Sequence, residues 1–343
     1  MNSDKKETVN EMVGFHEEIA KIQTAIADFE SGHKLNIAII AEPFAGRTTL
    51  LNEIEKMNQY KVTRLSFSSI VKNIDDVKLS EQSKRIVLID DCQYLYERKI
   101  GGFEILECFL KSAVSSSHLF ITTWNLFSWN YLDEVINIGK FFPVQIKLPK
   151  FTKDQIKECI LSGYKENEIK FEEDIAFEKE KVFEPRKYAV TIKPLEKTIN
   201  ILYFKINYNI LKVRLLKKEE RVAIEDIIFE KIHRFSNGNP GVAKIVWHKS
   251  LEYPIIKPSK IKDESFNIEL DYKESFVLFL ILSMKSINND ELSEILGHDF
   301  QVDKIIFRLS NQGLIAVDDV SCIIRPEALK SIIEFLKKLR LVW

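Results

Sequence analysis

The chain has 343 residues, 45% of them hydrophobic, which is enough for two or three domains with a large apolar core. Its 50 basic and 51 acidic residues leave a formal charge of −1, so the chain as a whole is not attracted to nucleic acid or to an acidic membrane. The densest apolar run has seven residues, where a membrane span needs about twenty, and the four cysteines form no C-x-x-C pair. We therefore expect a cytoplasmic protein with no membrane span, no disulfide frame and no zinc site.

The first predicted element is a helix that ends near residue 30. Residues 1–11 are polar, and Met12-Val13-Gly14-Phe15-His16-Glu17-Glu18-Ile19 opens the helix. Its apolar residues recur at the three- and four-residue spacing of one buried helix face.

A short apolar strand, residues 37–41, then runs into a turn and the start of a second helix. Compared with the phosphate-binding loop G-x-x-x-x-G-K-[ST], the turn has Ala41 at the first glycine and Arg47 at the lysine. Such a loop aims a concave run of backbone N–H groups at phosphate oxygens. Thr48 would hold Mg²⁺, and Arg47 would face the outer phosphates. The predicted nucleotide-binding residues here are Pro43, Phe44, Ala45, Gly46, Arg47, Thr48 and Thr49.

The two departures from the pattern have different consequences. Alanine at the first glycine is compatible with binding if that residue keeps β conformation. Arginine has a planar five-donor fork and cannot replace the point charge of an ammonium between two phosphates. Nucleotide binding is therefore expected more firmly than hydrolysis. The alternative is an ordinary strand, turn and helix with no phosphate site.

A second acidic motif follows at a suitable distance. A strand is expected over residues 61–67, and residues 85–91 form a charged entry, an apolar run and then Asp90-Asp91. Ligands of open α/β sheets bind outside the carboxyl ends of the strands, so Asp90 would reach Mg²⁺ through water and Asp91 would polarise the attacking water. The alternative for this motif alone is a solvated Asp-Asp turn. The two motifs in this order predict an α/β parallel-sheet P-loop NTPase core over residues 1–150.

These segments resemble the AAA+ ATPases of the archaeal origin-initiator type and the related STAND signalling ATPases. Val13, Gly14, Glu17 and Glu18 resemble the box that touches adenine in those proteins, although Phe15 stands where they have arginine. Residues 118–125 are expected to form another buried strand, whose polar end resembles the sensor 1 position. The resemblance gives Asn125, or alternatively Thr123, a contact with the γ-phosphate or the lytic water.

Residues 151–251 are expected to form a helical lid, with Thr152 as the N-cap of its first helix. A β insertion is predicted at about 185–216, because residues 204–210 alternate with a period of two. Its basic face is either a partner surface or simply solvated. The turn at 236–241 can cap one helix with Gly238 or Asn237 and start the next at Pro240. It resembles the sensor 2 turn, and Lys244 is the nearest cation.

A linker is expected over residues 252–269, which contain two prolines, and a C-terminal domain over 270–343. Three predicted helices, a hairpin around Asp318-Asp319 and a last helix resemble a winged-helix domain. Lys304 and Arg308 on the third helix would contact duplex DNA. From residue 271 onward, however, the sequence has more acidic than basic residues, which favours a protein partner or self-association.

Two functions remain open from the sequence. The first is an ATP-binding, slowly hydrolysing switch that acts on a macromolecular partner, with ATP and Mg²⁺ as cofactors. The second is a nucleotide-holding scaffold or initiator-like DNA-binding protein with little hydrolysis, which Arg47 favours. The sequence does not single out an arginine finger, and the conceivable ones are Arg98, Arg186, Arg221 and Arg234.

Overall fold

The computed structural model describes residues 13–59, 61–77, 85–174, 183–192, 197–206, 223–262, 266–297, 300–318 and 321–343. The N-terminal core (residues 13–150) contains a five-stranded parallel sheet with the strand order β2-β3-β4-β1-β5. Its strands are β1 (Ile37–Ala41), β2 (Val62–Ser66), β3 (Ile86–Asp90), β4 (Leu119–Asn125) and β5 (Val144–Lys147). Strands β1, β3 and β4 are buried along their whole length, as apolar runs of central parallel strands should be. This sheet confirms the predicted P-loop fold class.

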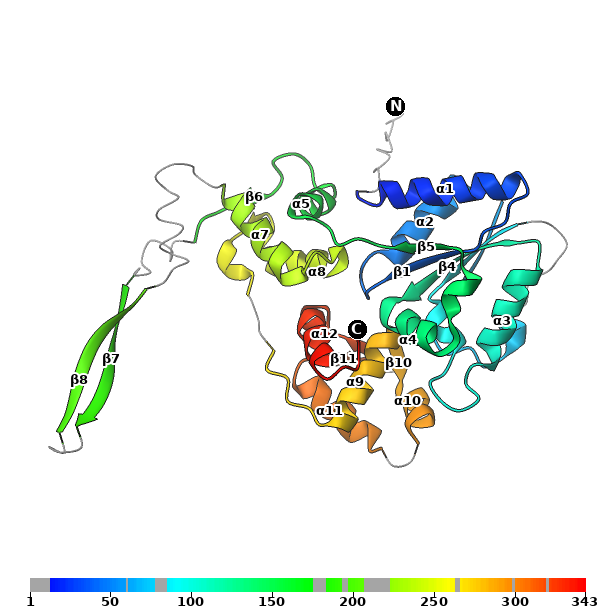
Figure 1. Cartoon of the computed structure of the whole chain (residues 1–343). Coiled ribbons are helices and arrows are strands. Elements are labelled where there is room, and N and C mark those ends of the chain that lie inside the picture. The colour runs from blue at the N-terminus through cyan, green and yellow to red at the C-terminus, as the bar shows by residue number, and fades with distance from the viewer. Residues whose placement is uncertain are drawn as a thin grey trace.

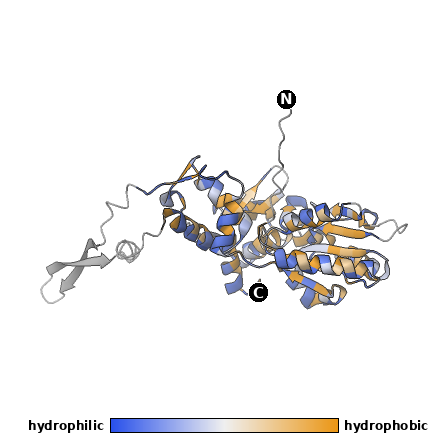
Figure 2. Cartoon of the chain, turned by 90° about the horizontal axis from the view of Figure 1, so that it is seen from above, coloured by the Kyte–Doolittle hydropathy of each residue, from blue (hydrophilic) through white to orange (hydrophobic). Residues whose placement is uncertain are grey.

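Helices cover the sheet from both sides. In Figure 1, α1 and α2 lie above the sheet and α3 and α4 below it. These helices are α1 (His16–Glu30), α2 (Arg47–Met57), α3 (Glu104–Ser115) and α4 (Leu126–Ile136), and short 3-10 turns occur at Ile74–Val77, Cys92–Leu95 and Ile138–Phe141. Seen from above, the strands are largely apolar, and the helices alternate apolar and polar residues (Figure 2). Helix α4 was not foreseen from the sequence, because its first turn continues an apolar run.

The register of the parallel strands places the predicted site residues at one edge of the sheet. Ala41 at the end of β1 lies opposite Asn125 at the end of β4. Asp90 at the end of β3 lies opposite Ser66 of β2. The carboxyl ends of parallel strands share one edge, so the loop after β1 and the acidic pair after β3 become neighbours.

The lid (residues 151–262) follows β5. It contains α5 (Lys153–Leu161), α7 (Ile224–Ser236), α8 (Pro240–Ser250) and a parallel pair of short strands, β6 (Lys170–Phe171) and β9 (Ile255–Ile256). Thr152 caps α5 in a capping box with Gln155, as predicted for this N-cap. Phe229 and Trp247 stack at 5.5 Å in its interior. Residues 255–261 of the expected linker belong to this folded unit, since Ile256 and Ile261 are buried.

The predicted β insertion is a hairpin that leaves the lid. Strands β7 (Phe183–Ile192) and β8 (Lys197–Ile206) pair antiparallel over ten residues each. Figure 1 shows them projecting away from the other elements. The hairpin starts two residues before the expected boundary, and most of the expected basic face, at residues 207–214, lies outside the described residues.

The C-terminal unit (residues 266–343) lies below the lid and beside the core in Figure 1. It contains α9 (Tyr272–Met284), β10 (Ser286–Asn288), α10 (Asn289–Leu296), α11 (Val302–Asn311), β11 (Ile315–Val317), β12 (Ser321–Ile324) and α12 (Leu329–Lys338). Its strands form a small antiparallel sheet in the order β10-β12-β11. Helix α9 is buried almost all round because it packs against the core as well as its own unit. No helix in the described part of the chain has the length and apolarity to span a bilayer.

Candidate functional site

The loop after β1 has the conformation of an open anion cradle. Phe44 and Gly46 both adopt positive φ, 65° and 94°. Helix α2 begins at Arg47, and no side chain caps its N-terminus. The first turn of a helix has N–H groups without partners inside the helix, and they carry partial positive charge. Thr48 and Thr49 are exposed in this turn.

The start of α8 in the lid holds this loop. The Phe44 carbonyl accepts a hydrogen bond from the Gly241 N–H at 3.1 Å. The Asn239 side-chain amide donates to the Pro43 carbonyl at 2.8 Å. A Cβ on residue 241 would lie 2.3 Å from the Phe44 carbonyl oxygen, so this close approach requires glycine. The lid therefore fixes the backbone of the cradle.

A cavity of about 360 Å³ opens between the loop and the lid. Its volume is within the ordinary range of small-molecule sites. The core contributes Phe44, Gly46 and Thr49, and the lid contributes Lys244. Val13 lines the same cavity from the segment before α1. Five residues predicted to bind nucleotide, from three separate segments, therefore meet at one cavity.

Gly14 and Phe15 connect the N-terminal segment to this cavity. Gly14 is buried with φ 77°, and a Cβ there would lie 2.5 Å from the Phe151 ring. The Phe15 ring packs on Phe151 at 5.0 Å. It also lies against Gly46, whose Cβ would be 3.2 Å from the ring. Phenylalanine at this position supplies an apolar wall of the cavity in place of a charge.

Arg47 does not face the cradle, contrary to the expectation that it contacts the outer phosphates. Its Nη1 donates to the Ala41 carbonyl at 2.9 Å, and its Nη2 contacts Asp91 Oδ1 at 3.3 Å. The side chain is 6% exposed. Burial lowers the pKa of the Arg47 guanidinium, and the Asp91 and Asp90 carboxylates oppose this shift. Arg47 is thus an internal ion-pair partner in this arrangement.

Asp90 is held by three donors. Its Oδ1 accepts from the Thr123 hydroxyl at 2.6 Å and from the Asp91 N–H at 3.1 Å. Its Oδ2 contacts Arg64 Nη2 at 3.3 Å. Carboxylate oxygens are the ligands that Mg²⁺ prefers, but Arg64 now occupies the outer one. Arg64 therefore competes with a metal ion for Oδ2.

Asp91 has positive φ, 58°, and its carboxylate is also buried. Its Oδ1 contacts Arg47 and accepts from the Gln93 side chain at 2.9 Å. Its Oδ2 forms an ion pair with Lys285, which follows α9 in the C-terminal unit. Burying a carboxylate is tolerable only with such partners. The residue expected to polarise water is therefore neutralised from two domains.

Asn125 is fully buried, and both ends of its amide are engaged. Its Oδ1 accepts from the Phe127 N–H, so the side chain caps α4. Its Nδ2 donates to the Leu282 carbonyl at the end of α9, at 2.8 Å. Asn125 thus caps the start of the next helix and also contacts the C-terminal unit. Thr123, the alternative sensor, orders the acidic pair because its hydroxyl also accepts from the Asp91 N–H at 2.8 Å.

Sequence reasoning missed Arg64 and Lys285. Arg64 also contacts Asn52 and Glu55 of α2, so it connects the acidic pair to that helix. A charged residue inside a predicted strand was the available signal for Arg64. Lys285 had no local signal, because only the docking of the C-terminal unit brings it to Asp91. Among the arginines considered as fingers, Arg98 stacks on Tyr131 at 4.1 Å and on Phe279 at 4.7 Å, inside the interface between the core and the C-terminal unit.

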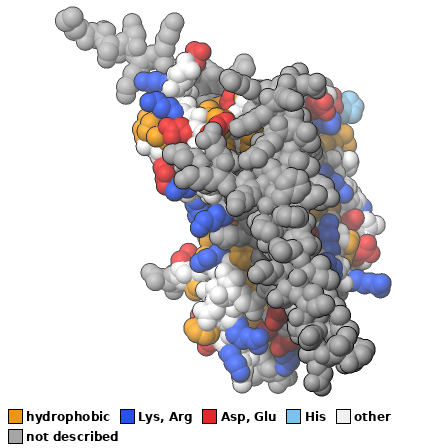
Figure 3. Space-filling model, turned by 90° about the vertical axis from the view of Figure 1, so that its left-hand side faces the viewer, with side chains coloured by type: hydrophobic (Ala, Val, Ile, Leu, Met, Phe, Trp, Pro, Cys, Tyr) orange, Lys and Arg blue, Asp and Glu red, His pale blue; other side chains and the backbone are white. Residues whose placement is uncertain are grey.

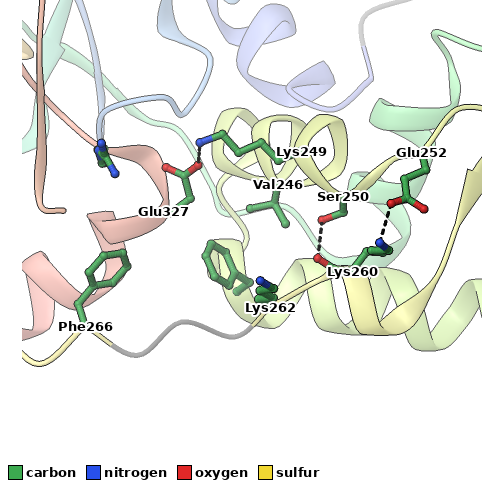
Figure 4. A pocket seen from close by; sticks show the side chains of 10 residues that line it. Val246, Lys249, Ser250, Glu252, Lys260, Lys262, Phe266 and Glu327 are labelled. Atoms are coloured by element: carbon green, nitrogen blue, oxygen red, sulfur yellow. Dashed lines mark hydrogen bonds and ion pairs between the residues drawn. The ribbon is translucent and has the colours of Figure 1, made fainter. Parts of the chain in front are cut away.

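A second cavity of about 460 Å³ separates the lid from the C-terminal unit. Figure 4 shows Lys249 of α8 paired with Glu327 across this gap, and Glu252 paired with Lys260 on the lid side. Phe266 and Lys262 also line it. Four cations and two carboxylates line it, and the two carboxylates pair with Lys249 and Lys260.

Surface charge on the described residues is mixed. In Figure 3, blue and red side chains alternate around the area that the grey atoms cover. On α11, Lys304 is exposed, but Arg308 forms an ion pair with Glu274 of α9. Phe307, between them in sequence, is 65% exposed. The two cations expected to contact DNA therefore flank an aromatic residue, and one of them has an acidic partner.

The contact between Gly241 and the loop after β1 can be tested by Gly241→Ala. The methyl group would strike the Phe44 carbonyl, and overpacking of this kind costs about 1–3 kcal/mol. We expect urea unfolding to show that loss. Gly163→Ala is the matched control, because its Cβ would lie an ordinary 3.6 Å from the nearest atom. Equal effects of the two variants would contradict the close contact.

The role of Thr123 can be tested by Thr123→Val, which keeps the shape and removes the hydroxyl. The buried Asp90 carboxylate then loses a donor, and hydrogen bonds to charged groups contribute about 1.5–3 kcal/mol. We expect a loss of this size in the free energy of unfolding. Thr63→Val on β2, two strands away, should change stability by less than about 0.5 kcal/mol, because among the described residues its hydroxyl accepts a hydrogen bond from Arg85 alone, at 3.4 Å. A silent Thr123→Val would show that the network does not stabilise the fold.

Comparison with known proteins gives structural matches only. No family model matches the chain, and no curated protein matches its sequence. The matching structures include the Holliday junction branch migration motor RuvB of Thermotoga maritima, which is 15% identical with a TM-score of 0.44, the match covering 94% of this chain and 96% of that one. The ORC2 protein of Aeropyrum pernix is 11% identical and CDC6P of Pyrobaculum aerophilum 12%, each with a TM-score of 0.44 over 98% of this chain and 97% of the other. At such identities the matches concern the fold alone.

Proposed function

We propose that the chain is a P-loop ATPase that binds ATP with Mg²⁺ between core and lid and acts as a nucleotide-dependent switch on a macromolecular partner. The observation that carries this proposal is the cavity at the uncapped N-terminus of α2, which Val13, Thr49 and Lys244 line together. Free N–H groups and a lysine suit an anionic phosphate chain. The apolar ring of Phe15 suits a base or sugar on the other side of the cavity.

Within this proposal each residue has a separate role. Thr48 and Asp90 hold Mg²⁺, and Asp91 and Asn125 position and polarise the attacking water for slow conversion of ATP and water to ADP and phosphate. The nucleotide is bound by Val13, Gly14, Pro43, Phe44, Ala45, Gly46, Thr48, Thr49 and Lys244. Arg47 joins them only if its guanidinium leaves Ala41 and Asp91. Mg²⁺ supplies charge neutralisation at the phosphates when it is bound. Asp90 fits such an ion if Arg64 gives way, and the exposed Thr48 needs no rearrangement.

We divide the chain into an ATPase core (1–150), a lid (151–251) with its β insertion, a linker (252–269), of which residues 255–261 pack on the lid, and a winged-helix domain (270–343). The order of elements in the C-terminal unit supports the last assignment: a helix, a short strand, two helices, a hairpin and a final helix. The exposed Phe307 on its third helix favours a protein partner or a second copy of the chain, because aromatic residues are enriched at protein interfaces. Duplex DNA at Lys304 and Arg308 is the alternative partner.

A second function is a scaffold or initiator-like protein that holds nucleotide with little turnover. The position of Arg47 favours it, since the guanidinium contacts Ala41 and Asp91 instead of facing the cradle. Positioning and electrostatic stabilisation account for nearly all catalysis of phosphoryl transfer. The two functions share the binding site. They differ in whether a positive charge at position 47 reaches the phosphoryl group that is transferred.

Nucleotide binding is tested by thermal unfolding with and without ATP and Mg²⁺. A ligand at a hundred times its Kd adds about 2.7 kcal/mol to the native state, so the melting temperature should rise. Thr48→Ala should remove most of the rise with little change in the unliganded protein, because the side chain is exposed. Thr24→Ala, an equally exposed site on α1, is the control and should keep the rise. An unchanged melting temperature of the parent at millimolar ATP would refute the proposal.

Arg47→Lys separates the two functions. Lysine releases the Asp91 Oδ1 contact and offers a point charge that can turn toward the phosphates. We expect the hydrolysis rate to rise with little loss of ATP affinity, and Asp91→Asn in that background to abolish the gain. The hydrolysis rate is measured as phosphate release under saturating ATP and Mg²⁺. A parent that already turns over at roughly 1 per second or faster, and is slowed by lysine, would show that the site is built around arginine.

A further inference from the structure

The end of helix α9 covers the carboxyl ends of β3 and β4. Three contacts come from four consecutive residues of the C-terminal unit. The Leu282 carbonyl accepts from Asn125, and the Ser283 carbonyl accepts from Ser128, each at 2.8 Å. Lys285 forms the ion pair with Asp91. The last carbonyls of a helix lack partners within it, so these core side chains complete the end of α9.

Lys285 holds an unfavourable backbone conformation to make this contact. Its φ is 72° and its ψ is −55°, which lies in the strained γ-turn region. Strain of this kind persists only when the surroundings enforce it. The turn directs the chain from α9 into β10, whose Ser286 N–H donates to the Tyr94 hydroxyl at 3.2 Å. Docking against the core thus holds the strained residue on both sides.

Asp91 and Asn125, the two residues assigned to the attacking water, both contact this docked unit. Asp91 Oδ1 is already engaged within the core by Arg47 and Gln93, and Lys285 takes Oδ2. Asn125 Oδ1 caps α4, and Leu282 takes Nδ2. While α9 is docked, Lys285 thus occupies Asp91 Oδ2, and both side chains are shut off from solvent, with Asp91 4% and Asn125 0% exposed. The cavity at Thr49 and Lys244, which α9 does not line, stays accessible.

We propose that the C-terminal unit is a removable cover on the catalytic face: docked, it leaves nucleotide binding possible and blocks hydrolysis, and undocking activates Asp91 and Asn125. This inference rests on the proposed ATPase function and names its regulation. Coupling of this kind is reciprocal, so a bound nucleotide that recruits Asp91 also weakens docking. A partner that binds the face of α9 or Lys285 shifts the same equilibrium.

The strength of docking comes from the core side. Besides the contacts above, Glu291 accepts from the Ile70 N–H at 3.0 Å, and Lys72 and Lys99 pair with Glu294 at the rim. Toward the lid there are fewer polar contacts: Lys249 pairs with Glu327, and Lys330 donates to the Arg234 carbonyl at 3.3 Å, beside the cavity in Figure 4. The rim ion pairs are exposed, so salt screens them and should favour undocking.

The test uses the full chain and two variants that loosen docking by different routes. Lys285→Met removes the charge at Asp91 and keeps the stem. Tyr94→Phe removes the hydroxyl bonded to Ser286 and leaves the charges at Asp91 unchanged. Lys337→Met, on the exposed side of α12, is the control for loss of a lysine in the same unit. Phosphate release is measured at saturating ATP and Mg²⁺, and hydrogen exchange is followed at the amides of Ile70 and Ser286.

We expect both docking variants to exchange faster at the Ile70 amide and to hydrolyse ATP at least about fivefold faster than the parent, with the control unchanged. The Ser286 amide reports docking in Lys285→Met only, because Tyr94→Phe itself removes its acceptor. Faster hydrolysis in Lys285→Met alone, with Tyr94→Phe undocked but no faster than the parent, would mean that only the charge at Asp91 matters. That result would contradict the proposed cover. Faster exchange without faster turnover in either variant would overturn it as well. Thermal shifts with ATP are measured in parallel to distinguish the two proposals. A parent that does not bind ATP refutes the proposed function. ATP binding without faster hydrolysis in the docking variants refutes the cover alone.

Discussion

Two adjacent carboxylates at the end of β3 constrain most of what surrounds them. Asp90 is 3% exposed and Asp91 4%, and buried charges are tolerated only with compensating charges and hydrogen bonds. The compensation comes from three places: Arg47 at the start of α2, Arg64 on β2 and Lys285 in the C-terminal unit. The same need accounts for the inward turn of Arg47, the link from β2 to α2 and the docking of a distant unit.

The candidate nucleotide site is divided between two neighbours of the core. The lid controls the binding half, since Gly241 and Asn239 hold the backbone of the loop after β1. The C-terminal unit contacts the proposed reacting half through Asp91 and Asn125. Because different contacts hold each half, the proposed switch would regulate nucleotide binding and hydrolysis separately.

Much of the local structure could be predicted from the sequence because short-range rules decide it. Thr152 caps α5, Pro240 starts α8, and Asn237 and Gly238 both take left-handed conformations at the end of α7. The linker was predicted less well. Its prolines are typical of a loop, and yet Ile256 pairs with β6 and is buried. The partners of Asn125 and the orientation of Arg47 could not be predicted, because each depends on contacts with residues far away in the sequence.

The sequence by itself determined the buried strands, the loop after β1, the acidic pair after β3 and the order of helices and hairpins. Hydrophobic periodicity, caps and turn residues act over a few positions, so they can be recognised without knowing the fold. Only the tertiary structure decided the strand order, which brings Ala41, Asp90 and Asn125 to one edge. It also decided that Lys285 pairs with Asp91, although the two residues are 194 positions apart in the sequence. Ion pairs over such a separation follow from how whole units pack and not from any local pattern.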